Sequence, residues 1–349
     1  MHELTPVLER LLDGDRLDEA EAAALLERLT DENQPPVMVS AILAAMRVRG
    51  ESADEVRGLA RAMRSLARRP RIDGGDQTVA RPSIDIVGTG GDGSGSINIS
   101  TGVALLSAAI GLRVVKHGNR SISSRSGSAD VLEALGLPMP LDEDDAGEVL
   151  RKTNFTFLFA PHYHPAMKTL APIRRAMAVR TVFNILGPLT NPAEPEYHLL
   201  GAYSSEVAKL MAEALAGLPI ERAFVVHGAE GWDEATPIGP FQLFDVRPGR
   251  VEEEVRDPAD LSLPRCTADD LRGADAEDNA EAIRAIFGGA PGAGRDTLLL
   301  GAALALEVSG EVDSAQEGIE RAREAIDSGK ATALLHALGE FGRSRSAGQ

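Results

Sequence analysis

IDIVGTGGDGSGSINISTGVALLSAAIGLRVVKHGNRSISSRSGSADVLEALG, residues Ile84–Gly136, is the stretch that decides the fold. Its first residues, Ile84–Val87, alternate in the manner of a buried strand, and the chain then enters a glycine-rich loop, Gly88–Gly95. The residues Gly102–Ile110 predict an apolar helix that ends at Gly111. A strand, a glycine loop and a helix in this order predict a site where backbone atoms reach a ligand.

The glycine loop lacks Cβ atoms at Gly88, Gly90, Gly91, Gly93 and Gly95, so that successive N–H groups can turn toward an anion. Asn98, Ser100 and Thr101 are expected to cap the following helix with their side chains. Because a helix N-terminus favours negative charge, the loop and the helix together predict a phosphate site.

Charge along this stretch supports the same interpretation. The 349-residue chain has 53 Asp and Glu residues and a formal net charge of -17, yet none of them lies from Gly93 to Ala129, where about five or six would be expected. The same segment holds the cations Arg113, Lys116, Arg120 and Arg125. A positive segment in an acidic chain predicts a polyanionic ligand such as a polyphosphate.

Other phosphate-binding patterns match less well. Gly88, Gly90 and Gly93 fit G-x-G-x-x-G after a strand, but the acidic residue that would bind a ribose hydroxyl about 20 residues later is missing. A P-loop is excluded because no G-K-[ST] follows. A purely structural turn would not need so many glycines beside cations.

Four motifs in this stretch resemble the signature series of the anthranilate phosphoribosyltransferase family, in order and in spacing. They are Gly88–Asp92, Asn98–Thr101, Lys116–Arg120 and Gly127–Glu133. The resemblance implies transfer of a phosphoribosyl group from phosphoribosyl pyrophosphate to the amine of anthranilate in tryptophan biosynthesis. Pyrophosphate is the other product.

Composition bounds the remaining possibilities. Hydrophobic residues make up 43% and charged residues 26% of the chain, which is ordinary for a globular protein. No apolar run approaches the roughly 18 residues of a membrane helix, and the first residues lack a signal-peptide pattern. The single cysteine, Cys266, favours a reducing cytoplasm. The acidic balance argues against general nucleic-acid binding, so neither nucleic acid nor a membrane is an expected partner.

The chain is long enough for two domains, and its periodicities change along its length. Residues 1–72 contain helical stripes and no strand pattern, whereas later segments alternate strands and helices in the rhythm of a parallel sheet. The expected fold class is α/β, with a small all-helical domain and a large α/β domain whose central sheet is mainly parallel. The expected parts are a helical domain at 1–72, a hinge at 73–82, an α/β domain at 83–164 and 193–341, a segment at about 165–192 that returns to the helical domain, and a disordered tail at 342–349. The resemblance implies a homodimer through the helical domain.

A pair of carboxylates follows the predicted strand Arg222–His227. Adjacent acids on a loop are usually solvated, but Asp233 and Glu234 lie where a strand of a parallel sheet ends, which makes them candidate magnesium ligands. The resemblance adds the hydroxyl of Ser100 and implies two magnesium ions. Trp232 stands where the family usually has leucine.

The resemblance also assigns substrate contacts. For phosphoribosyl pyrophosphate it implies Gly88, Gly91, Asp92, Ser96, Asn98, Ile99, Ser100, Thr101, Lys116, Ser124 and Ser128, with Ser96 in place of the usual threonine. For anthranilate it implies Gly88, Asn119, Arg174, His117 and His164.

Residue chemistry alone leaves two of these choices open. An arginine can grip both oxygens of a benzoate carboxylate, but nothing except the resemblance separates Arg174 from Arg175. His162 and His164 are spaced like metal ligands, yet no cysteine or third histidine stands near, which favours a structural or substrate-lining role. Ala178 stands where the family usually has glycine.

The implied reaction needs no dedicated acid or base from the protein, because an aromatic amine is already neutral and the departing group is the polyanion. Stabilising that polyanion is the main task, and backbone N–H groups and magnesium suit it. Three rival interpretations are a pyrimidine nucleoside phosphorylase of similar architecture, a non-catalytic relative that binds nucleic acid, and a purely structural helical dimer. The first would replace the segment Ser123–Asp130 and needs no paired magnesium carboxylates. The intact Gly88–Asp92 motif and the acidic charge oppose the second, and the third leaves the glycine loop unexplained.

Overall fold

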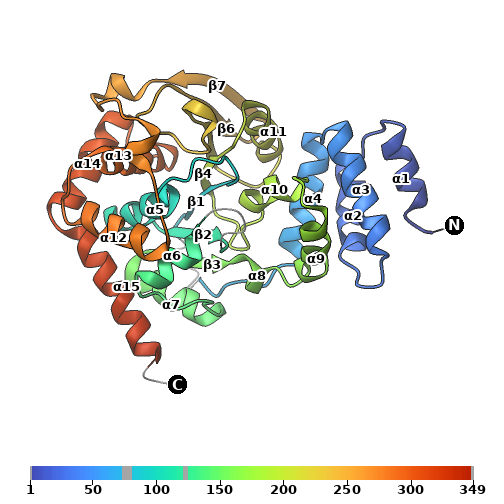
Figure 1. The fold of residues 1–349 in the computed structure, drawn as a ribbon, viewed down its shortest axis with the longest axis horizontal. Helices are drawn as coiled ribbons and strands as arrows, with labels where there is room; N and C mark the ends of the chain where they lie inside the picture. The colour runs from blue at the N-terminus through green and yellow to red at the C-terminus, as the bar shows by residue number, and fades with distance from the viewer. Residues whose placement is uncertain (1, 73–80, 121–124, 347–349) are drawn as a thin grey trace.

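The computed structural model describes residues 2–72, 81–120 and 125–346. Its N-terminal part is helical, as predicted, with α1 (Thr5–Leu12), α2 (Glu19–Leu29), α3 (Pro36–Arg49) and α4 (Ala53–Ser65). Asp18 and Ser52 each form a capping box at the start of α2 and α4. These helices form the lobe beside the N-terminus in Figure 1.

The second part is built on a seven-stranded sheet in the order β3-β2-β1-β4-β5-β6-β7. The first five strands along the chain are parallel, and the last two are antiparallel. Their bounds are β1 Ile84–Gly88, β2 Val114–Gly118, β3 Phe155–Phe159, β4 Tyr197–Gly201, β5 Arg222–His227, β6 Phe241–Arg247 and β7 Arg250–Arg256. The predicted fold class is therefore confirmed, and the carboxyl ends of β1, β4 and β5 meet at one edge, where α/β sheets bind ligands.

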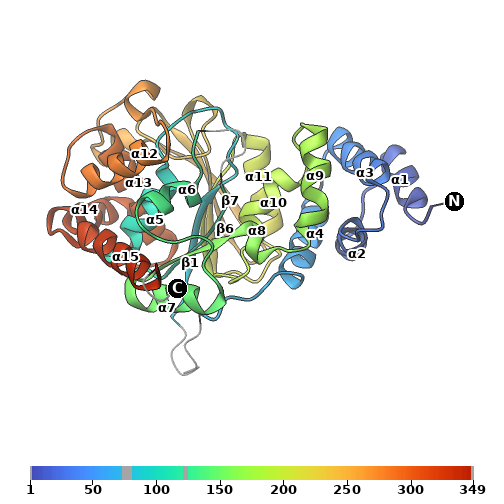
Figure 2. The ribbon, with the colours of Figure 1, turned by 60° about the horizontal axis from the view of Figure 1, so that its bottom comes forward.

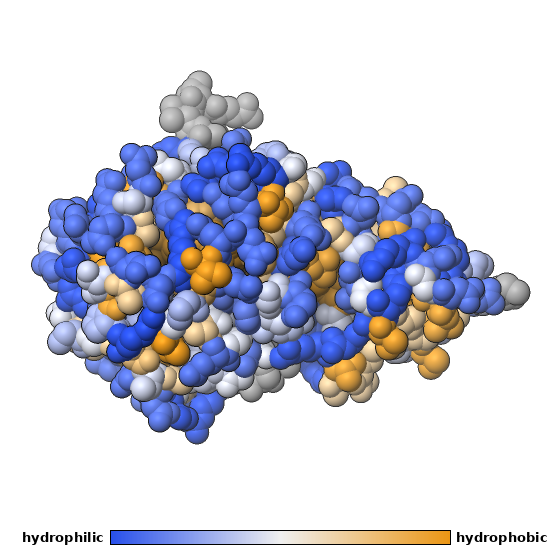
Figure 3. Space-filling view, turned by 90° about the horizontal axis from the view of Figure 1, so that it is seen from above, coloured by the Kyte–Doolittle hydropathy of each residue, from blue (hydrophilic) through white to orange (hydrophobic). Residues whose placement is uncertain are grey.

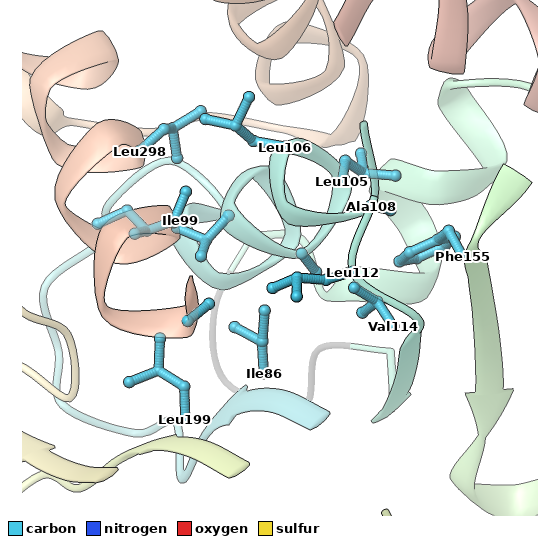
Figure 4. Packing of buried hydrophobic residues seen from close by; sticks show 14 of the residues in the cluster. Ile86, Ile99, Leu105, Leu106, Ala108, Leu112, Val114, Phe155, Leu199 and Leu298 are labelled. Carbon is cyan, nitrogen blue, oxygen red and sulfur yellow. The ribbon is translucent and has the colours of Figure 1, made fainter. Parts of the chain in front are cut away.

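One face of the sheet is covered by helices that follow the glycine loop and by those that close the chain (Figure 1). They are α5 (Ile99–Ile110), α6 (Ser128–Ala134), α7 (Glu143–Thr153), α12 (Ala276–Phe287), α13 (Ala293–Val308), α14 (Ala315–Asp327) and α15 (Lys330–Ser346). Figure 4 shows Ile99 of α5 above Ile86 of β1, with Leu298 of α13 close to the same end of α5, where it packs against Gly102. Since α5 is buried on most sides, its N-terminus is held firmly against the sheet.

The other face carries α11 (Ser205–Leu215) and the returning segment, residues 165–192, which contains α9 (Met167–Met177) and α10 (Phe183–Leu186) after the short α8 (Ala160–Tyr163). Helix α9 contacts α3, and α10 contacts α4. Figure 2 shows α9 and α10 between the sheet and the helical lobe. One buried hydrophobic cluster joins the helical domain, this segment and the sheet. The domain boundaries expected from the sequence stay a prediction.

The predicted disordered tail is wrong for residues 342–346, because α15 continues to Ser346. Phe341 is buried, Arg345 forms ion pairs with Asp145 and Glu148 of α7, and a Cβ at Gly342 would overlap the carbonyl of Gly136. A segment rich in Arg, Ser and Gly is therefore packed as a helix end. Residues 347–349 of the predicted tail and 73–80 of the predicted hinge lie outside the described residues.

Among the helices that the structure describes, none combines the length and the apolar character needed to cross a membrane.

Candidate active site

The glycine loop leaves the carboxyl end of β1 in a conformation that needs glycine. Gly90 and Gly91 have φ angles of 67° and 72°, and Gly93 and Gly95 have similar positive values. Residues with a Cβ adopt this left-handed region only at a cost of about 1 kcal/mol or more. At its far end, the loop is tied to residues 271–273, since the carbonyl of Gly95 accepts a hydrogen bond of 2.8 Å from Gly273. The predicted glycine loop is thus a defined structure with exposed backbone.

A second loop, Gly228–Glu234, lies directly on the strand ends, and we call it the carboxylate loop. Glycine stands where each supporting strand meets it: at Gly88 a Cβ would overlap the Asp233 carboxylate, and at Gly201 it would overlap the Asp233 carbonyl. A Cβ at Gly228 would overlap the carbonyl of Glu234. Gly88 therefore lets the glycine loop and the carboxylate loop approach each other, Gly201 lets β4 pass close to the carboxylate loop, and Gly228 lets that loop fold back on itself.

Asp233 is buried and joins the two loops. Its Oδ2 accepts a hydrogen bond of 2.6 Å from the Gly90 N–H, while its own N–H donates to Asp92 Oδ2 over 3.4 Å. The other oxygen of Asp92 accepts from the N–H and the hydroxyl of Ser94, at 3.1 and 3.0 Å. Burial, with the nearby negative charge of Asp92, raises the pKa of Asp233 to about 7.

Glu234, and not a side chain at the start of α5, accepts a hydrogen bond from the N-terminus of that helix. Asn98, Ser100 and Thr101 were expected to cap α5, but Asn98 makes no side-chain capping hydrogen bond. Instead, Glu234 Oε1 accepts the Ser100 N–H at 3.1 Å, across 134 positions of sequence. Asn98 is therefore not committed to the helix end, and Thr101 is wholly buried, with a hydroxyl that finds no partner among the described residues.

Burial and the charge of Asp233 raise the pKa of Glu234 well above its ordinary value. Asp233 is buried and Glu234 is half-buried, and two neighbouring carboxylates in this setting would be stabilised by a hard cation. Across the described ranges no three His, Cys, Asp or Glu side chains form a ready-made metal cluster. Magnesium, however, usually takes one or two carboxylates together with substrate phosphates and waters, so Asp233 and Glu234 fit this ion.

Lys116 lies at the back of the site. It is wholly buried in β2, and its Nζ donates to the carbonyl of Ile86 and, over 3.2 Å, to the hydroxyl of Ser100. Burial lowers its pKa, while Asp85, Glu234 and Asp233 oppose that shift. Lys116 therefore donates a hydrogen bond to Ser100 from the interior of the fold. A direct contact between Lys116 and the substrate stays a prediction.

Asp85 is a residue that the sequence analysis missed. It is wholly buried, and its Oδ1 accepts the His117 N–H at 3.1 Å while its Oδ2 accepts Asn191 Nδ2 at 2.8 Å. Burial raises its pKa to about 6, and the charge of Lys116 opposes this shift. The signal in the sequence is an acidic residue, Asp85, within the apolar run Ile84–Val87.

Two cations of the positive segment contact other parts of the fold, which corrects part of the expectation from the sequence. Arg113 precedes β2, at the opposite end from the glycine loop, and donates to the carbonyls of Arg81 and Ile72. Arg120 forms ion pairs with Asp130, at 2.7 Å, and with Glu133. Much of the positive charge is thus used within the fold, and backbone N–H groups are the main feature that could hold an anion.

The remaining predicted phosphoribosyl pyrophosphate contacts fall around the same edge. Ser96 is half-buried where the glycine loop bridges Arg272, Ile99 is buried as the first residue of α5, and Ser128 begins α6. Ser124 lies outside the described residues.

Two buried histidines lie beside this edge. The rings of His117 and His164 meet edge to face with centroids 5.0 Å apart, and His117 Nδ1 lies 3.1 Å from the carbonyl of Gly187. Burial lowers the pKa of His117 to about 3 and that of His164 to about 4, so both rings are neutral near pH 7. His162 turns away, toward Glu143 at 3.6 Å, so the H-x-H pair does not converge.

The predicted site residue Asn119 is exposed at the end of β2 and accepts a hydrogen bond of 2.7 Å from Arg120 N.

The structure distinguishes the two candidate arginines. Arg174 is half-buried, with its guanidinium 5.2 Å from the centre of the Phe183 ring, whereas Arg175 is exposed. Burial lowers the pKa of Arg174, and no carboxylate among the described residues pairs with it. Ala178, which ends α9, has a left-handed φ of 52°, in keeping with the glycine that the family usually has there.

Arg180 is a second residue that sequence reasoning missed. Its Nη2 donates to the carbonyl of Gly91, and its guanidinium lies 4.0 Å from the centre of the Tyr203 ring. It therefore links the returning segment to the glycine loop. Nothing in the local pattern signals this contact, because it spans 89 positions of sequence.

Comparison with known proteins agrees with this geometry. Residues 5–67 match a glycosyl transferase family described as a helical bundle domain, and residues 80–332 match its a/b domain. The anthranilate phosphoribosyltransferase of Solibacter usitatus is 44% identical over 344 residues, which cover 98% of this chain and 99% of the relative. That of Brevibacillus brevis is 44% identical over 326 residues, which cover 93% and 94%.

Solved structures are similar over nearly the whole chain. Anthranilate phosphoribosyltransferase from Thermus thermophilus superposes with a TM-score of 0.88 at 41% identity and covers 96% of this chain and 99% of its own. The Saccharomyces cerevisiae enzyme in complex with PRPP and Mg has a TM-score of 0.86 at 27% identity, with 98% and 99% covered. The chain therefore belongs to the anthranilate phosphoribosyltransferase family.

Proposed function

We propose that this protein transfers the phosphoribosyl group of phosphoribosyl pyrophosphate to the amine of anthranilate, in the cytoplasm, as a step of tryptophan biosynthesis. The observation that carries the proposal is the junction of the glycine loop and the carboxylate loop, where Asp233 accepts the Gly90 N–H. That junction combines a phosphate cradle with ligands for a cation.

The pyrophosphate half of the site rests mainly on backbone atoms. The N–H groups of Gly91 and Asp92 would bind the leaving group, with Ser96, Asn98 and Ser128 adding hydrogen bonds, since the Gly90 and Ser100 N–H groups already donate to Asp233 and Glu234. These groups are fixed before the reaction, so they can stabilise developing negative charge without rearranging.

Ser100, Asp233 and Glu234 are the residues that we propose for magnesium, with two ions in each site. When bound, magnesium would neutralise the charge that accumulates on the departing pyrophosphate. The raised pKa values of both carboxylates support this role, because burial beside a like charge disfavours their ionised forms until a cation is present.

Arg174 is the proposed anthranilate anchor, since a half-buried guanidinium without a carboxylate partner in the described chain is suited to a benzoate. Gly88, Asn119, His117 and His164 would line the same pocket. The amine lone pair would form the bond to the anomeric carbon as the bond from that carbon to the pyrophosphate oxygen breaks. Pyrophosphate would leave with the electrons of the broken bond, and the nitrogen would lose one proton to solvent or to the departing pyrophosphate. The low pKa values of His117 and His164 make them weak bases, which supports a mechanism without a dedicated protein base.

A homodimer through the helical domain is the proposed assembly. Three hydrophobic side chains of this domain are largely exposed in the single chain: Leu12 of α1 at 68%, and Val37 and Val48 of α3 at 81% and 89%. Figure 3 shows hydrophobic patches on this end of the molecule. A partner surface would remove them from water.

The loss of anthranilate fluorescence tests the function. We expect purified protein to consume anthranilate only when phosphoribosyl pyrophosphate and magnesium are both present. Phosphate-dependent cleavage of thymidine, with anthranilate unchanged, would instead indicate a pyrimidine nucleoside phosphorylase.

A further inference from the structure

Asn279 lies outside the motifs of Ile84–Gly136, yet it contacts Asn98, a proposed substrate ligand. It is a buried residue of α12, 2% exposed, and its Nδ2 donates to Asn98 Oδ1 at 2.8 Å, across 181 positions of sequence. The same nitrogen donates to Ser126 Oγ, also at 2.8 Å. A buried side-chain network of this kind is stable only if its donors and acceptors match.

A backbone N–H group fixes which atom donates and which accepts in each hydrogen bond of this network. The Ala274 N–H can only donate, and Asn279 Oδ1 accepts from it at 2.9 Å. The amide of Asn279 is therefore fixed with its oxygen toward Ala274 and its nitrogen toward Asn98 and Ser126. Because that nitrogen can only donate, the Asn98 atom that faces it must be the acceptor, Oδ1.

Ser126 strengthens the same orientation. Its hydroxyl accepts from Asn279 and donates to Asn98 Oδ1 at 3.0 Å, so that this oxygen receives two hydrogen bonds from the interior. Asn98 Nδ2 is left on the other side of the amide, where its nearest acceptor in the described chain is the Ser126 carbonyl at 3.5 Å. An N–H of Asn98 thus remains for a ligand, at the junction of the glycine loop and α5.

We propose that Asn279 is a positioning residue that holds the amide of Asn98 with its nitrogen toward phosphoribosyl pyrophosphate. This inference rests on the proposed function. A freely rotating amide would offer the polyanion its oxygen or its nitrogen, and only the nitrogen is attractive. Asn279 removes the wrong orientation without touching the substrate.

The test uses Asn279→Asp, which keeps the shape of the side chain but replaces its donors with acceptors. The carboxylate would repel Asn98 Oδ1 and turn the amide around. We expect the KM for phosphoribosyl pyrophosphate to rise by about 10- to 100-fold, with a much smaller change in the KM for anthranilate. Ser126→Ala, which removes one donor and adds no charge, should raise the same KM by a smaller factor.

Asp275→Ala is the matched control. Asp275 caps the start of α12 through the Asp278 N–H, at 3.1 Å, and is exposed, so its loss weakens the same helix without touching Asn98. We expect a lower melting temperature and an unchanged KM for phosphoribosyl pyrophosphate. An equal KM increase in this control would mean that α12 acts only through general stability, which would overturn the inference.

Combination with Asn98→Ala completes the test. Without the Asn98 amide there is nothing to orient, so Asn279→Asp should add no further increase in the KM for phosphoribosyl pyrophosphate in that background. Additive effects would overturn the inference, as would an unchanged KM in Ser126→Ala if Asn279→Asp does not fold. A wild-type protein that leaves anthranilate unconsumed would overturn the proposed function itself, whereas active wild-type protein with these variants unchanged would overturn only the role of Asn279.

Discussion

The half of the site on the carboxyl ends of β1, β4 and β5 is built from backbone N–H groups and from carboxylates that the fold holds close together. The half contributed by α9 and the neighbouring histidines is built instead from neutral rings and a half-buried cation, Arg174, without a carboxylate partner in the described chain. The first half has an excess of negative charge from the protein, and the second has an unbalanced positive charge. Each half is suited to a different ligand, a cation with a polyphosphate in one and a carboxylate in the other.

Removing the carboxylates of the first half should have the largest effect. The double variant Asp233→Asn with Glu234→Gln should lower kcat/KM by about a thousandfold, because the departing pyrophosphate loses its metal-assisted stabilisation. Anthranilate fluorescence at several magnesium concentrations measures this. The control is Glu252→Gln with Glu253→Gln, an adjacent exposed pair on the edge strand β7, which should keep full activity. Magnesium dependence that survives in the Asp233 and Glu234 variant would contradict the metal assignment.

Shortening the Arg174 side chain, in the second half of the site, should weaken the binding of anthranilate. Arg174→Ala should raise the KM for anthranilate by about 10- to 100-fold, since a charge-assisted pair with the benzoate is lost, and should leave the KM for phosphoribosyl pyrophosphate nearly unchanged. Arg175→Ala, which removes the exposed neighbour on α9, is the control. Equal effects of the two variants would remove the distinction between these arginines.

The excess negative charge of the first half should also affect stability. Burial raises the pKa of Asp233 from 3.8 to about 7, so between these pH values the folded protein keeps a proton that the unfolded chain has lost. The stability that this proton provides therefore falls as pH rises through that window. Asp233→Asn cannot lose a proton, so its melting temperature should exceed that of the wild type by a few degrees above pH 7 and by less at pH 5. A difference that does not change with pH would contradict the raised pKa.

The smallest effect is expected at the end of α9. Ala178 has a φ of 52°, so Ala178→Gly should stabilise the protein by about 1 kcal/mol, which raises the melting temperature by about 2 °C. Ala176→Gly, inside the same helix, should instead destabilise it by about 1 kcal/mol. If both substitutions destabilise the protein, the left-handed conformation at Ala178 is wrong.

The sequence predicted what depends on local pattern. The glycine loop, the parallel strands and the acidic pair after β5 each carry a signal within about ten residues of chain. Contacts that join distant segments had no such signal: Glu234 at the N-terminus of α5, Arg180 on Gly91 and Asn279 on Asn98 became visible only in the folded chain. Arg345 shows the opposite error, because its polar neighbours suggested disorder while its ion pairs with α7 stabilise a helix end.

Crystals grown with phosphoribosyl pyrophosphate and Mn²⁺, an anomalous scatterer in place of magnesium, test the central claim directly. We expect the pyrophosphate on the N–H groups of Gly91 and Asp92, and manganese in contact with Asp233 and Glu234. Phosphoribosyl pyrophosphate bound elsewhere, with the junction of the two loops empty, would contradict the account.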